Sequence, residues 1–112
     1  MVSIETFRKL ALSFDDSSEE PHFELTSFRV NKKIFATLNI EKKMVCLMLN
    51  ELDQSVFITF DLSIIYPVPN KWGKKGATYV DLVKVSKSIL KDGLAHAYQK
   101  ATKYTNKKKK TA

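Results

Sequence analysis

Cysteine, arginine and long apolar runs are scarce in this chain of 112 residues, and each scarcity excludes a class of protein. A single cysteine, Cys46, can form no internal disulfide. No apolar run approaches the ~18 residues of a membrane span, and the residues after Met1 do not have the pattern of a secretory signal peptide. We therefore expect a cytoplasmic, monomeric protein with no membrane segment.

The motifs of the common catalytic and cofactor sites are also missing. The chain has no HExxH, CxxC, GxSxG, phosphate-loop or dinucleotide-binding motif. Cys46 lies between Val45 and Leu47, with nothing nearby to activate its thiol, and is predicted to be a small core residue. We predict that the protein is no enzyme and holds no cofactor or metal ion.

His22 is the residue that leaves an enzyme hypothesis open. It lies near Glu19, Glu20 and Glu24, so a general acid–base pair is conceivable. A histidine in such a position more often makes a local hydrogen bond, and catalysis by His22 is accordingly the third hypothesis.

What the chain does have is ordinary globular composition with an uneven charge. Hydrophobic residues make up 44% and charged residues 28%, which fits one compact domain. Residues 1–30 carry a balance of −3 and residues 31–112 a balance of +10. Four lysines at 107–110 supply part of this excess. We predict a single domain over residues 1–104 and a disordered basic tail over residues 105–112.

Hydrophobic periodicity predicts an α+β fold with helices packed on an antiparallel sheet. Ser3 caps a first helix, and residues 15–21 form an acidic loop after it. A three-stranded meander follows over residues 22–30, 34–40 and 44–49, with turns at 31–33 and 41–43 and the third strand buried on both faces. The expected core phenylalanines are Phe7, Phe14, Phe23, Phe28 and Phe35.

The second half predicts a helix, a strand and a last helix. Residues 51–60 are assigned to a short helix after Asn50, although Val56, Ile58 and Thr59 would also suit a strand. Residues 64–69 are extended because of their prolines, and residues 70–76 form a loop. A strand over 77–82 precedes a helix over about 86–104, in which Gly93 is tolerated if it permits close packing.

The basic residues inside the predicted fold concentrate at turns and in the 70–76 loop. If both hairpin tips and this loop share one face, they form a cationic surface that binds a polyanion through its phosphates. Lysine outnumbers arginine seventeen to two, which suits non-specific charge contact better than bidentate base recognition. The candidate nucleic-acid-binding residues are Arg29, Lys32, Lys33, Lys42, Lys43, Lys71, Trp72, Lys74 and Lys75.

The plainer alternative, which the sequence slightly favours, gives these residues no ligand. Lysines at turns protect hairpin edges from aggregation, and Trp72 packs over the sheet. In the functional interpretation, Trp72 instead stacks on a base or enters a groove.

Over residues 3–101 the chain resembles the MmcQ/YjbR family of small bacterial proteins. No single motif carries the resemblance, which rests on order and spacing. The features are the first helix and acidic loop, His22-Phe23 before SFRV at 27–30, KIFA at 33–36, a helix centred on Leu52, a Pro-rich segment into Asn70-Lys71, TYVDL at 78–82 and Tyr98 in the last helix.

The resemblance implies a double-wing fold similar to a phage activator's DNA-binding domain, and with it DNA binding. The chain departs from the family at the strand after Asn70-Lys71, which starts with Ala77 where members usually have an aromatic residue. Our leading hypothesis is a non-enzymatic protein that contacts double-stranded DNA through phosphates. The alternative is a protein-interaction or small-ligand module without nucleic-acid function.

Overall fold

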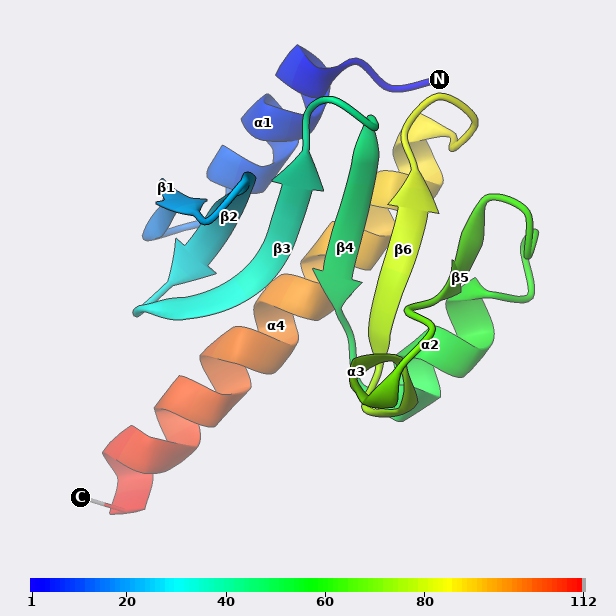
Figure 1. The fold of residues 1–112 in the computed structure, drawn as a ribbon. Coiled ribbons are helices and arrows are strands. Elements are labelled where there is room, and N and C mark those ends of the chain that lie inside the picture. The colour runs from blue at the N-terminus through cyan, green and yellow to red at the C-terminus, as the bar shows by residue number, and fades with distance from the viewer. Residues whose placement is uncertain (112) are drawn as a thin grey trace.

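The structure is a computed structural model that describes the backbone of residues 1–111 and the side chains of residues 1–103. Over these residues the chain forms four helices and a six-stranded sheet in the order β1-β2-β3-β4-β6-β5, antiparallel throughout (Figure 1). The predicted α+β class is confirmed. The elements are α1 (Ile4–Leu12), β1 (Ser17–His22), β2 (Leu25–Val30), β3 (Lys33–Asn39), β4 (Met44–Met48), α2 (Glu51–Phe57), β5 (Ile65–Pro67), α3 (Lys71–Lys74), β6 (Ala77–Asp81) and α4 (Lys87–Thr111).

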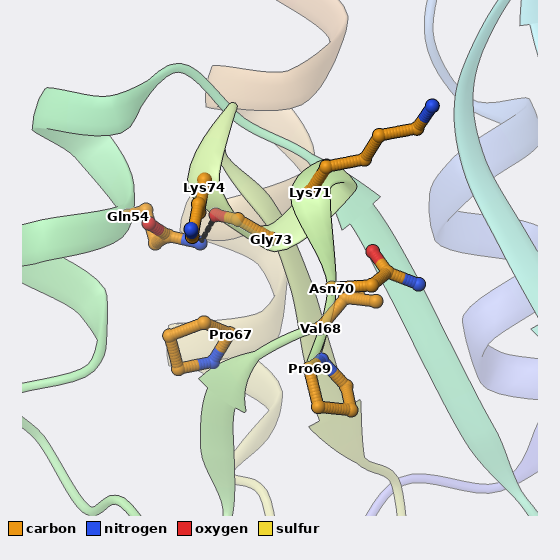
Figure 2. A pocket seen from close by; sticks show the side chains of 8 residues that line it. All are labelled: Gln54, Pro67, Val68, Pro69, Asn70, Lys71, Gly73 and Lys74. Atoms are coloured by element: carbon orange, nitrogen blue, oxygen red, sulfur yellow. Dashed lines mark hydrogen bonds between the residues drawn. The ribbon is translucent and has the colours of Figure 1, made fainter.

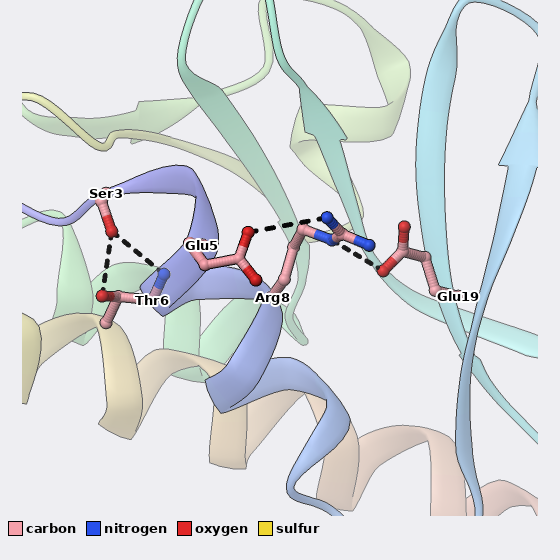
Figure 3. A network of polar contacts seen from close by, with 5 residues as sticks. All are labelled: Ser3, Glu5, Thr6, Arg8 and Glu19. Carbon is pink, nitrogen blue, oxygen red and sulfur yellow. Dashed lines mark hydrogen bonds and ion pairs between the residues drawn. The ribbon is translucent and has the colours of Figure 1, made fainter.

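Helix α1 begins where the sequence predicts, because Ser3 caps it. The Ser3 hydroxyl accepts a hydrogen bond from the Thr6 backbone N–H at 3.0 Å (Figure 3). Further along α1, the Arg8 Nε donates to Glu19 Oε1 at 3.0 Å and so ties the helix to β1. Because the Arg8 side chain is largely solvated, this ion pair orients the two elements more than it stabilises them.

The core lies between one face of the sheet and the helices α1 and α4 (Figure 1). The rings of Phe7 and Phe28 stack with centroids 5.2 Å apart, and Tyr98 from α4 stacks on Phe14 at 4.7 Å. The Tyr98 hydroxyl also donates to the Asp15 carbonyl at 2.7 Å, which fastens the end of α1 to α4. Four of the five predicted core phenylalanines contribute to this core.

Phe23 is the exception, and its prediction as a core residue was wrong. It is 94% exposed, because β1 and β2 form a hairpin whose turn is made by residues 23 and 24. The positive φ of Phe23, 58°, places it at the bend of the chain, where the alternation of the strands does not apply.

The predicted acidic loop at 15–21 was also wrong for most of its length. Residues 17–22 form the edge strand β1, paired with β2 from Ser17↔Val30 to His22↔Leu25. Its side chains are polar, so hydrophobic alternation could not indicate a strand. An edge position explains this composition, and Pro21 is tolerated there because an edge strand leaves some backbone groups unpaired.

Strand β4 is buried on one face, whereas the sequence predicted burial on both. Val45 and Leu47 are buried, while Met44, Cys46 and Met48 are half-buried. These three side chains alternate onto the sheet face opposite α4, which no described helix covers (Figure 1).

The predicted helix after Asn50 is confirmed as α2, where the Asn50 side chain accepts from the Asp53 N–H at 2.7 Å. Phe57 packs into the core, whereas Leu52 and Val56 are 73% and 53% exposed. Helix α2 therefore carries an apolar outer side.

The predicted loop at 70–76 contains the short helix α3, and its two glycines let it approach the strands. A Cβ on Gly73 would lie 1.7 Å from the Val68 carbonyl oxygen, and one on Gly76 would lie 2.0 Å from that of Leu49. Gly76 also has a φ of +116°, which other residues rarely adopt. Both positions therefore require glycine.

Helix α4 begins where predicted and buries Leu90, Leu94, Ala97 and Ala101. Gly93 lies close to the sheet, because a Cβ there would lie 2.8 Å from Leu47 Cδ1. The backbone of the predicted disordered tail is instead described as a continuation of α4 to Thr111, past the predicted helix end near residue 104, and its side chains lie outside the described part. Among the described residues, no helix has the length and apolar character needed to cross a membrane.

We predict that Gly73→Ala lowers the free energy of unfolding by about 1–3 kcal/mol, because the added methyl group meets a backbone carbonyl that cannot move aside easily. Urea denaturation measures the change. The neighbouring Lys74→Ala, at an exposed side chain of the same helix, is the control and should change stability by less than about 0.5 kcal/mol. Equal stability of the two variants would contradict the packing described here.

Candidate nucleic-acid interface

A basic pocket of about 460 Å³ lies where the β2–β3 hairpin, the end of β4, α3 and α4 meet. Five of the lining residues are lysine or arginine, and none of the described residues that line it is acidic. We call this cavity the basic pocket. Its lining residues are His22, Arg29, Lys32, Lys33, Ile34, Met48, Leu49, Trp72, Lys75, Ala77 and Lys100.

The β2–β3 hairpin supplies three of the five cations. Asn31 and Lys32 have φ values of 51° and 69°, as a two-residue type I′ turn requires, and Val30 pairs with Lys33. Lys32 therefore lies at the exposed tip. Arg29 lies one register pair further back, where its Nε donates to Ser27 Oγ at 2.9 Å.

The charge of Arg29 is partly offset by the Glu20 carboxylate on the neighbouring strand β1. Its Nε is 3.9 Å from Glu20 Oε2, at the limit of an ion pair, and its side chain is 24% exposed. Arg29 is thus restrained by contacts on both β1 and β2.

Lys100 reaches the basic pocket from α4. Its Nζ donates to the Leu49 carbonyl at 3.1 Å. Burial, and secondarily the nearby charge of Lys33, lower the pKa of Lys100 below its ordinary value. The amine is therefore held in place next to a like charge, where an anion would be favourable.

Sequence reasoning missed Lys100 as a site residue. The available signal was its position beside Ala101 and three residues after Ala97, at the edge of the apolar stripe of the predicted helix. That signal places the amine near the core boundary, but it does not indicate which strand end lies opposite.

Trp72 in α3 and Lys75 directly after α3 also line the pocket. The Asn70 side chain accepts from the Trp72 N–H at 2.8 Å and starts α3, and the Trp72 side chain is left 53% exposed. Lys75 Nζ lies 5.5 Å from the centroid of the indole ring, a cation–π contact. The Trp72 ring lines the pocket together with Met48 and Ala77 of the sheet.

Lys71 and Lys74 line a separate hollow of about 570 Å³ together with Gln54 and the Pro67–Pro69 turn. Figure 2 shows the Lys71 side chain directed away from Gln54 and Lys74. Gln54 itself is engaged, because its Nε2 donates to the carbonyls of Gly73 and Ala77 at 2.8 and 3.1 Å. This hollow has structural contacts but no convergence of cations.

Lys42 and Lys43 do not join the other candidates. They form the β3–β4 turn, which lies at the far end of β3 from Lys32 and Lys33, roughly 20 Å along the strand (Figure 1). Successive tips of an antiparallel meander must lie at opposite ends of the sheet. The condition for one cationic surface, that both hairpin tips lie together, is therefore not met by Lys42 and Lys43.

His22 lines the basic pocket, with its ring edge against Phe23 at a centroid distance of 4.9 Å. Its neighbours Glu19 and Glu20 are instead paired with Arg8 and Arg29. Within the described part of the chain, no group of three or more His, Cys, Asp or Glu side chains could hold a metal ion. The local chemistry favours anion binding over acid–base work.

The uncovered sheet face holds a smaller cavity of about 210 Å³ that includes Cys46, Tyr66 and Tyr79. Cys46 was predicted to be a core residue, and it is half-buried on this face. Desolvation raises the pKa of its thiol to about 11.

Comparisons of the chain with models of protein families, with curated proteins and with solved structures give no match. The fold and the basic pocket therefore define the protein as an α+β domain with a cationic, aromatic-walled cavity. The resemblance to the MmcQ/YjbR family stays a prediction.

We predict that Cys46 of the folded protein is alkylated about a hundredfold more slowly near pH 8 than in the urea-unfolded chain, because little of the thiol is ionised. The rate should rise about tenfold per pH unit until the pH reaches about 11. Timed alkylation followed by mass spectrometry checks both statements. Equal rates in the folded and unfolded chain would contradict the environment described for Cys46.

Proposed function

We propose that this protein binds nucleic acid through its phosphates at the basic pocket and its rim. The observation that carries the proposal is convergence. Cations from the β2–β3 hairpin, from the end of α3 and from α4 line one cavity whose described lining contains no carboxylate. Such an arrangement favours a polyanion.

Binding in this form is electrostatic and depends little on base sequence. Lysine ammonium groups act as point charges on phosphate oxygens, and condensed counterions are released when they bind. Lys71 and Lys74 are exposed on α3, next to Trp72, and extend the positive charge beyond the pocket. Double-stranded DNA is the partner expected from the sequence. We further propose a monomeric, cytoplasmic binding protein without catalytic activity.

We predict that Lys32→Met/Lys75→Met weakens binding to a labelled oligonucleotide about tenfold or more at low salt. Removing two phosphate contacts should also reduce the slope of log K against log salt by about 1.8. Fluorescence anisotropy between about 50 and 200 mM salt measures both quantities, with duplex and single-stranded probes.

Lys42→Met/Lys43→Met is the matched control. It removes the same charge from the opposite end of the sheet, and its affinity should stay close to that of the unchanged protein. Equal losses in the two variants would mean that net charge, and not the basic pocket, determines binding.

The exposed apolar side of α2 favours the second candidate, a protein-interaction module. Leu52 and Val56 on α2 and Phe60 in the turn after it are each more than half exposed, and a contiguous patch of such side chains marks a contact surface. A single protein retained after nuclease treatment by the full chain, and lost in Leu52→Ser, would favour this candidate over nucleic-acid binding.

A further inference from the structure

The basic pocket has the size of a small-molecule site, and its lining combines cationic side chains with an aromatic and an apolar part. Its volume of about 460 Å³ lies within the usual range for bound ligands of drug or cofactor size. A surface that only follows a phosphate backbone needs no such cavity. The shape of the pocket therefore restricts the class of ligand more than its charge does.

The lining combines two kinds of chemistry. Lys33 and Lys100 are close enough for the charge of one to affect the other, and both line the cavity. Trp72, with Lys75 beside its ring, supplies a partly exposed aromatic face. Met48 at the end of β4 is half-buried and adds apolar surface to the same lining.

The two lysines gain from an anion. Lys100 is held by the Leu49 carbonyl, and the charge of Lys33 contributes, after burial, to lowering the pKa of Lys100, so the two positive charges repel each other. A bound phosphate would offset this repulsion by charge-assisted hydrogen bonds. The indole, in contrast, favours a flat ring, and base stacking is tolerant of base identity.

We propose that the basic pocket binds one nucleoside phosphate unit, with its phosphate at Lys33 and Lys100 and its base against Trp72. This inference rests on the proposed function and deepens it. A base within a duplex is stacked between its neighbours and cannot offer its face to Trp72. The unit is therefore an unpaired nucleotide of a strand or a free nucleotide.

Trp72 is the single tryptophan of the chain, so its fluorescence reports on this pocket alone. We expect AMP to change the fluorescence of the full chain saturably. Adenosine and inorganic phosphate should each bind at least about tenfold more weakly, because each offers half of the recognised chemistry. Phosphate that binds as tightly as AMP would overturn the proposal.

Two variants test the assigned phosphate position. Lys33→Met and Lys100→Met should each weaken AMP binding about tenfold, whereas Lys42→Met, at the far end of the sheet, should leave it unchanged. Lys33→Met keeps the test decisive if Lys100→Met fails to fold. Unchanged affinity in a folded Lys33→Met variant would overturn the assignment.

Competition separates this inference from the proposed function. Displacement of AMP by a single-stranded oligonucleotide, at least about tenfold more effective than by the duplex, supports both. AMP binding with no oligonucleotide binding supports the pocket for a free nucleotide and overturns the proposed function. Oligonucleotide binding without any AMP effect overturns the inference alone. Absence of both overturns both.

Discussion

Packing of α4 against β3 and β4 is the contact on which the rest of this structure depends. Leu90 and Leu94 are fully buried, and burying a leucine side chain is worth about 1.5–3 kcal/mol. Gly93 lets the helix backbone approach until a Cβ would touch Leu47. From this position α4 holds the end of α1 through Tyr98, which bonds to the Asp15 carbonyl. Helix α4 thus links the N-terminal segment to the sheet and covers the core.

The same contact creates the basic pocket. Because α4 passes the end of β4, Lys100 reaches the Leu49 carbonyl, 51 positions earlier in the chain. Gly76 brings the chain after α3 against that same carbonyl, and Trp72 and Lys75, which precede it, line the same cavity. Like charges are therefore held together by apolar packing, at some cost in stability.

The individual helices and strands differ in how well the sequence predicts them. Helices α1, α2 and α4 and strands β2, β3, β4 and β6 were predictable, because their apolar residues recur at the helical or strand period. Strand β1 was not, since its polar residues are held by backbone pairing to β2. Phe23 was misplaced because alternation was continued through a turn. The separation of Lys42 and Lys43 from Lys32 was predictable from the meander itself, whose successive tips must alternate between the ends of the sheet.

The sequence by itself determined the α+β class, the excess of lysine at turns and the position of the single tryptophan between prolines and glycines. These follow from local periodicity, turn chemistry and composition. Tertiary structure alone decided which cations meet. Arg29, Lys33, Lys75 and Lys100 are dispersed along the chain, and their convergence depends on strand order and on how closely α3 and α4 pack. Local sequence cannot encode these distances, because they are set by long-range packing of apolar side chains and by the glycines that permit it.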